Sequence, residues 1–183
     1  MNDAFETLKP LLGGSESPHL GPQRRLEALA WPEVERQLDD RLAQTRLDGQ
    51  RAALIRSLVL LWHDHLDASH TLSQAIHSAD GSFLHGIMHR REPDFGNAAY
   101  WFRKVGEHPI YPLLAREIAT LETESEFKSA LIRDDRWNPL AMIDACEAVE
   151  VSAADEADAA FLRTVQAAEF RLLLQHFSGN QLT

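Results

Sequence analysis

Residues 48–77, DGQRAALIRSLVLLWHDHLDASHTLSQAIH, are the stretch that decides the fold prediction. Residues 50–79 contain neither proline nor glycine, so nothing there interrupts a helix. Asp48 is a typical N-cap residue, because its carboxylate can accept a hydrogen bond from a free backbone N–H of the first turn. Apolar residues recur on one side at helical spacing: Ala52, Ile55, Val59, Trp62, Leu66 and Ile76. The pattern predicts one long helix with a buried face.

The rest of the chain shows the same helical pattern in shorter pieces. Prolines, glycines and two capping boxes, Thr123 with Glu126 and Ser152 with Asp155, separate these pieces. The further helices are expected over residues 31–44, 82–91, 95–105, 111–121, 126–133, 139–150 and 153–177. No stretch alternates with period two for long enough to predict a strand. The predicted fold is therefore all-α, a single-domain irregular bundle of about seven or eight helices over residues 1–183, with residues 1–21 as a flexible leader.

Composition excludes several classes of protein. The chain has 183 residues, of which 44% are hydrophobic, and its formal net charge is -10. That charge argues against nucleic acid and anionic membranes as partners. Cys146 is the single cysteine, so neither an internal disulfide nor a cysteine-only zinc site can form. The first ten residues lack the pattern of a signal peptide and no apolar run is long enough to span a bilayer, which predicts a cytoplasmic protein.

Histidine is the unusual feature of this composition, because six of the nine histidines lie between His63 and His89. On the predicted long helix, spacings of four and three residues place one set of polar side chains on a single stripe. The stripe consists of His63, Asp67, His70, Gln74 and His77. Imidazole and carboxylate groups both bind metal ions, and they replace here the Glu, Lys and Arg typical of a solvated face.

The next predicted helix adds His85 and His89, whose i, i+4 spacing lets both imidazoles reach one ion. The short turn at Asp80-Gly81 predicts that the two helices are antiparallel neighbours, with a cleft between them. The candidate metal ligands are His63, Asp67, His70, His85 and His89. Nitrogen ligands with a carboxylate suit zinc, iron, manganese or nickel better than calcium or magnesium. Residues 48–109 therefore form the candidate site unit.

A small anion is the expected ligand of this cleft. Residues 78–112 carry four basic and four acidic side chains, so this segment is neutral inside an acidic protein. Guanidinium groups close to histidines can hold a carboxylate or a phosphate through paired hydrogen bonds. The candidate ligand-binding residues are His77, Arg90, Arg91, Asn97 and Arg103. Together with a metal ion, they would fit metal-assisted hydrolysis or non-haem metal chemistry.

Three alternatives remain open at this point. The histidines can be structural, satisfied by Asp64, Asp67, Gln74 or backbone carbonyls, or they can serve a metal-free acid–base site. The arginines can pair with Glu92 and Asp94 at the Pro93 corner. The protein would then be a non-enzymatic binding or assembly module, and an exposed member of Tyr100-Trp101-Phe102 would favour a homodimer.

Two runs, WHDHLDASH and LHGIMHRREPDFGNAAYWFRKVGEHP, give the chain a wider resemblance. Together they resemble the signature of an uncharacterised family of small all-helical proteins. The resemblance covers residues 60–109 and has no named activity. It implies that the predicted helices over residues 48–77 and 82–91 and the RREPD corner, residues 90–94, belong to one structural unit.

Overall fold

The computed structural model confirms the all-α fold class, with a small two-stranded hairpin as the only sheet among the residues that it describes, 3–14, 16–152 and 156–180. These residues form nine α-helices and one short 3-10 helix, η1. The elements in chain order are α1 (Ala4–Leu8), η1 (Lys9–Leu12), α2 (Trp31–Leu42), α3 (Gly49–Trp62), α4 (Leu66–Ser73), α5 (Ala79–Arg91), α6 (Phe95–Val105), α7 (Tyr111–Thr120), β1 (Ile132–Arg133), β2 (Arg136–Trp137), α8 (Pro139–Ser152) and α9 (Glu156–Phe177).

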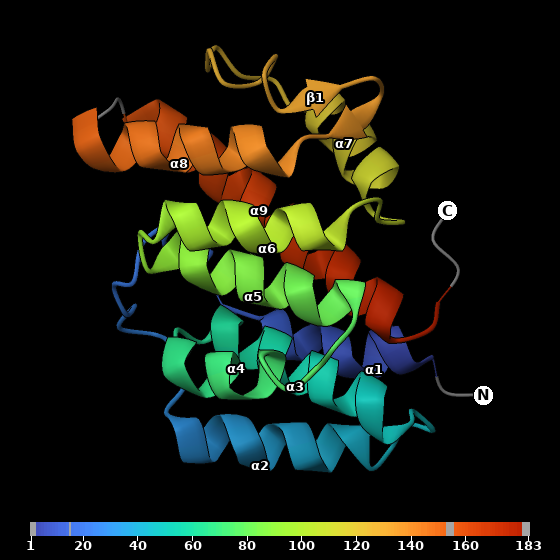
Figure 1. Ribbon diagram of the computed structural model, residues 1–183. Helices are drawn as coiled ribbons and strands as arrows, with labels where there is room; N and C mark the ends of the chain where they lie inside the picture. Colours follow the sequence, from blue (N-terminus) through green and yellow to red (C-terminus); the bar gives the residue numbers. More distant parts are fainter. Residues whose placement is uncertain (1–2, 15, 153–155, 181–183) are drawn as a thin grey trace.

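The helices lie in stacked rows, as Figure 1 shows. α2 lies at one end of the molecule, α3 and α4 form the next row, and α5 and α6 lie beside one another across the middle. α7, the hairpin and α8 lie at the opposite end from α2. The long helix α9 packs against α3, α7 and α8, and thereby connects the two ends.

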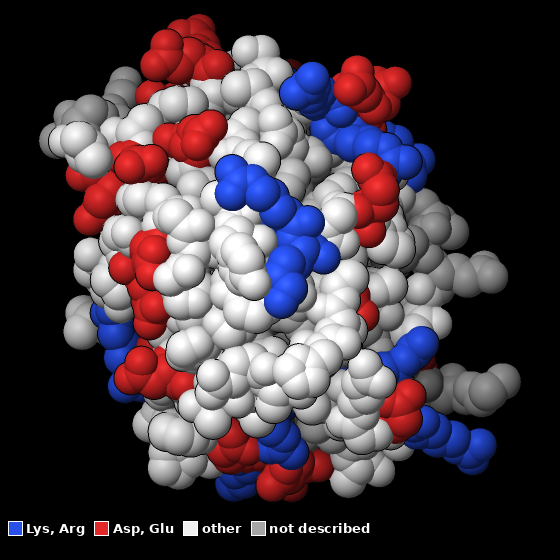
Figure 2. Space-filling model, in the orientation of Figure 1, with Lys and Arg blue, Asp and Glu red and all other residues white. Residues whose placement is uncertain are grey.

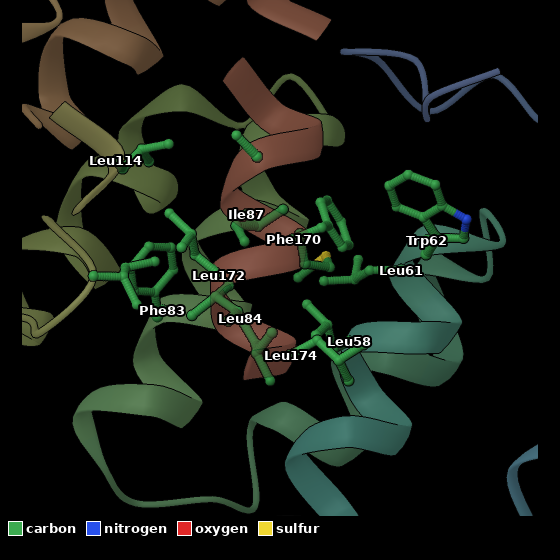
Figure 3. Close-up of a cluster of buried hydrophobic side chains, with 14 of the residues drawn as sticks. Leu58, Leu61, Trp62, Phe83, Leu84, Ile87, Leu114, Phe170, Leu172 and Leu174 are labelled. Carbon is green, nitrogen blue, oxygen red and sulfur yellow. The ribbon is translucent and has the colours of Figure 1, made fainter. Parts of the chain in front are cut away.

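The core is centred on α3, α5 and α9 (Figure 3), which supply Leu58 and Leu61, Leu84 and Ile87, and Phe170 and Leu174 respectively. Each such side chain contributes about 1.5–3 kcal/mol when it is removed from water. Gly86 allows α5 and α6 to approach closely, because a Cβ atom at this position would lie 2.8 Å from the ring of Phe102. A larger residue would force the two helices apart.

The prediction of one helix over residues 48–77 is wrong, because the chain breaks between α3 and α4. Asp64 adopts a left-handed conformation with φ 63°. Its buried carboxylate accepts a hydrogen bond at 3.0 Å from Nε of Arg25 and at 2.7 Å from an Nη of Arg91. Two charge-assisted bonds to a buried carboxylate can maintain a local strain of about 1–3 kcal/mol. Tertiary ion pairs therefore override the local helical pattern.

Two other regions also differ from the sequence expectation. The leader packs into the core, where Leu8 and Leu11 are 0% and 1% exposed. Residues 126–133, expected as a helix, form turns that lead into β1, and Oγ1 of Thr123 accepts a hydrogen bond from the N–H of Ser125. The second predicted capping box, Ser152 with Asp155, lies partly outside the described residues. Within the described part of the chain, no helix is both long enough and apolar enough to cross a bilayer.

Candidate functional site

Three histidines from α4 and α5 meet beside the break in the chain. The break reorients α4 so that His70 faces His85 and His89, which lie one turn apart on α5. The ring of His70 lies 4.7 Å from that of His85 and 5.5 Å from that of His89, measured between centroids. One nitrogen from each of the three rings lies within 4.8 Å of the other two. This spacing can hold one metal ion, and the three residues are called the His70 cluster below.

Burial favours the neutral form of two imidazoles of this cluster, those of His85 and His89. His85 is 3% exposed, and burial together with His70, His89 and Lys104 lowers its pKa to about 4. Burial also lowers the pKa of His89, although the carboxylates of Glu92 and Asp94 oppose the shift. Neutral imidazole is the form that binds a metal ion, so at neutral pH no proton has to leave these two residues before an ion binds.

One buried nitrogen of the cluster lacks a hydrogen-bond partner. Nδ1 of His85 forms no hydrogen bond within the described residues, whereas Nδ1 of His89 has the carboxylate of Glu92 at 3.4 Å. A buried polar atom without a partner costs about 1–3 kcal/mol, and such atoms are rare in folded proteins. A metal ion or another ligand at the cluster would satisfy nitrogens of this kind.

Carboxylates and a cation surround the three rings. Nδ1 of His89 lies 3.4 Å from Glu92 and 3.8 Å from Asp94, at the corner between α5 and α6. The predicted ligand Asp67 is exposed and is not among the groups that converge with the three imidazoles. On the other side, the ring of Trp101 stacks on His85 at 4.0 Å, and Nζ of Lys104 lies 4.3 Å from the Trp101 ring. The cluster can therefore take a carboxylate ligand from the corner, with a positive charge near its opposite side.

Two open pockets flank the cluster. One, of about 370 Å³, is lined by Asp67 and by Glu92, the residue closest to His89. The other, of about 380 Å³, is lined by His77, Ser78, Ser82, Trp101 and Lys104. Figure 2 shows basic side chains near the middle of this face, over α6, and acidic side chains mostly toward its edge. Small molecules can therefore reach two neighbours of the cluster, Glu92 beside His89 and Trp101 beside His85.

The predicted metal ligands divide into two groups. The structure brings His70, His85 and His89 together, and does not bring His63 or Asp67 to them. The ring of His63 is fully engaged, since Nε2 lies 3.0 Å from the carbonyl oxygen of Leu11 and Nδ1 accepts the N–H of Leu29. The break at Asp64 separates His63 from the other residues of the predicted stripe. Of the predicted metal ligands on that stripe, only His70 therefore reaches His85 and His89.

The predicted ligand-binding arginines occupy other positions. Arg90 and Arg91 follow His89 on α5, and both side chains point into the core, where they are 1% and 0% exposed. Arg90 pairs with Glu169, and Arg91 pairs with Asp64. These two arginines cannot reach a ligand, and that part of the prediction is wrong.

The remaining predicted residues and one missed residue lie at the surface. Asn97 donates a hydrogen bond of 2.6 Å to Asp94, and His77 lines the 380 Å³ pocket. Arg103 lines a different pocket, beside the hairpin. The cation closest to the histidines is Lys104, which sequence reasoning did not select. Its i, i+3 spacing from Trp101 was the available signal, but nothing in the sequence placed Trp101 against His85.

A second group, the Asp80 cluster, joins residues that are far apart in the sequence. Oδ1 of Asp80, in the first turn of α5, lies 2.9 Å from Nε2 of His108 and 3.1 Å from Nε2 of His176, near the end of α9. The two imidazoles lower the pKa of Asp80. Neither His108 nor His176 is among the site residues predicted from the sequence.

The hydrogen bonds of His108 distinguish this cluster from the first. Its Nδ1 accepts the N–H of Ile110 at 3.4 Å, so its proton is on Nε2 and is donated to Asp80. A histidine that binds a metal through one nitrogen normally donates a hydrogen bond from the other. His108 lacks this arrangement, so the Asp80 cluster serves better as a hydrogen-bonded link between α5, α7 and α9 than as a ligand set.

Comparison with known proteins adds no relative to these observations. No family model, no curated protein and no solved structure matches the chain. The geometry of the two clusters is therefore the basis for a functional conclusion.

Proposed function

We propose that this protein binds a transition-metal ion at the His70 cluster. The observation that carries the proposal is a set of three converging imidazoles in which the buried Nδ1 of His85 has no hydrogen-bond partner. Nitrogen ligands with a carboxylate nearby favour zinc, iron, manganese or nickel over calcium or magnesium. The carboxylate of Glu92 or Asp94 would lie beside His89 as a neighbour of the three nitrogen ligands, and the stacked Trp101 would fix the orientation of His85.

The reaction class that this set supports best is metal-assisted hydrolysis. Three protein ligands leave one coordination position of the ion free for water. The ion lowers the pKa of a water molecule bound there toward neutrality. A small anionic substrate would approach through the 380 Å³ pocket, where Lys104 and His77 supply positive or hydrogen-bonding groups. Arg90 and Arg91 have no part in this proposal, because both are enclosed in the core.

The test is metal binding to protein purified without an affinity tag and stripped with a chelator. Calorimetry with zinc, and absorption spectroscopy with cobalt as a coloured substitute, would report affinity, stoichiometry and ligand type. We expect one ion per chain. Replacement of His70 by Ala, or of His85 by Ala, should weaken binding by at least a hundredfold, because the loss of an outer-sphere partner alone costs about 10–100-fold.

Two control variants make this result specific. His19→Ala removes an imidazole outside both clusters and should leave the affinity unchanged. His176→Ala removes a member of the Asp80 cluster and should also leave one ion bound. Binding that survives His70→Ala and His85→Ala, or that is lost in His176→Ala alone, would overturn the assignment. No binding to the intact chain would favour a module with structural histidines.

A further inference from the structure

A third region of the molecule has the features of a binding site and contains no residue of either histidine cluster. It is a pocket of about 330 Å³ between the end of α6, the start of α7, the β1–β2 hairpin and the start of α8. In Figure 1 these elements lie at the end of the molecule opposite α2, and Figure 2 shows basic and acidic side chains gathered over this end. Phe102, Trp137 and Leu140 give the pocket an apolar wall.

The hairpin concentrates positive charge at the pocket. Its two-residue turn consists of Asp134 and Asp135, both with positive φ, as a tight hairpin requires. Arg133 and Arg136 are direct partners across the strands, so their side chains lie on the same face, and both line the pocket. Like charges placed directly opposite each other destabilise a hairpin unless a counter-charge is present.

Acidic neighbours compensate this charge only in part. Arg136 pairs with Glu107, and Asp134 lies 3.7 Å from Nε of Arg133. Arg103 lines the same pocket and forms no ion pair within the described residues. Three arginines against two carboxylates leave an excess of one positive charge in a protein that is otherwise acidic. The start of α8, which also lines the pocket, adds the positive end of a helix dipole.

Two buried donors without partners line the same pocket. Tyr111 and Trp137 are 4% and 2% exposed, and neither the hydroxyl of Tyr111 nor Nε1 of Trp137 has a hydrogen-bond partner in the described structure. Burial raises the pKa of Tyr111, so its hydroxyl keeps the proton that it can donate. Unpaired buried donors call for an acceptor from a ligand.

We infer that this pocket binds a small organic monocarboxylate with an apolar body. The carboxylate would accept hydrogen bonds from Arg103, from the hairpin arginines and from the two buried donors. Its single charge matches the single positive excess, whereas a phosphate monoester would bring about two negative charges. The apolar body would pack against Phe102 and Leu140. This inference does not depend on the metal site.

The experiment compares benzoate and 4-methylpentanoate with benzamide, the neutral analogue of benzoate, by calorimetry on the full chain. We expect saturable one-to-one binding of the carboxylates, no binding of benzamide, and weaker binding of phenyl phosphate. Failure of all the carboxylates to bind, or equal binding of benzamide, would overturn the proposal. Tighter binding of phenyl phosphate would overturn the assignment to a monocarboxylate.

Variants locate the ligand within the pocket. Arg103→Gln should raise the dissociation constant by about tenfold or more, as expected for the loss of a charge-assisted hydrogen bond. Tyr111→Phe should weaken binding while it raises the melting temperature of the free protein, because it removes an unpartnered buried hydroxyl. Arg36→Gln on α2 is the matched control and should bind like the unmodified chain. Unchanged binding in both Arg103→Gln and Tyr111→Phe would contradict the proposed position.

Discussion

The His70 cluster and the Asp80 cluster contain similar groups at similar spacing but differ in their hydrogen bonds. In the Asp80 cluster one carboxylate accepts from two imidazoles, and the second nitrogen of His108 is also engaged. In the His70 cluster the buried Nδ1 of His85 lacks a partner. The difference teaches that proximity alone does not define a candidate metal site. An unpaired nitrogen is a better indicator of a metal site, because it can bind an ion without first giving up a hydrogen bond.

The largest effect that separates the clusters should come from zinc. At a concentration a thousandfold above its dissociation constant, a ligand that binds only the folded state adds about 4 kcal/mol to the free energy of unfolding. We expect this gain for the unmodified chain and for His108→Ala, and its loss in His85→Ala. Denaturant unfolding with and without zinc measures it. A gain that is lost in His108→Ala and kept in His85→Ala would reverse the roles of the two clusters.

Without metal, the order of the two variants should be the opposite. His108→Ala leaves the N–H of Ile110 without its acceptor and Asp80 with His176 as its remaining imidazole partner, so we expect a loss of about 2 kcal/mol in the free energy of unfolding. His85→Ala removes stacking against Trp101 but also removes an unpartnered nitrogen, so we expect a loss of about 1 kcal/mol. Urea unfolding of the stripped proteins tests this order. Equal losses would show that the hydrogen-bonding difference has no energetic consequence.

The next effect is pH dependence of stability. Because the pKa of His85 is about 4 in the folded chain against an ordinary value of 6.5, the unfolded chain binds more protons between these values. The contribution of His85 to the free energy of unfolding should therefore be highest above pH 6.5 and fall by about 3 kcal/mol as the pH drops to 4.

Two variants separate this window from that of the Asp80 cluster. His85→Gln should make the profile less steep between pH 6.5 and 4, where His89 also contributes. Asp80 has a lowered pKa, so its contribution is lost only as the pH falls below its ordinary value of 3.8, and Asp80→Asn should change the slope of the profile only in that acidic limb. Urea midpoints from pH 7 to 3 would measure both. A flat profile in the unmodified chain would contradict the burial argument for His85.

Local signals predicted much of the fold. The caps at Asp48 and Asp94 and the glycine at position 106 fix the start of α3 and both ends of α6, and the structure places these boundaries where the sequence does. The break at Asp64 was not predictable in this way, because it depends on Arg25 and Arg91, which are distant in sequence. The hairpin was missed because its strands have only two residues each, too few to show alternation.

The candidate site was also predictable only where it depends on residues that are close in sequence. His85 and His89 share a face through helical spacing alone, and the short connection from α4 to α5 brings His70 to them. The roles of Arg90 and Arg91 depend on α9 and on the leader, so spacing could not distinguish a core arginine from a ligand-binding one. The Asp80 cluster joins residues up to 96 positions apart, and no local pattern encodes such a meeting.

The smallest effect tests whether the charge of Lys104 acts on the His70 cluster. Lys104 contributes to the lowered pKa of His85, and the same positive charge would repel an incoming cation. Because Lys104 is exposed, solvent screens this repulsion, and an interaction of this kind is worth about 0.2–1 kcal/mol. Lys104→Gln should therefore tighten zinc binding by about two- to threefold at low salt, and the difference should shrink as the salt concentration rises.

Arg36→Gln on α2 provides the control for a lost surface charge, and calorimetry at two ionic strengths measures both variants. Weaker zinc binding in Lys104→Gln would contradict this electrostatic account, because it would mean that the lysine supports the ligand set through contacts, for example by holding Trp101 against His85.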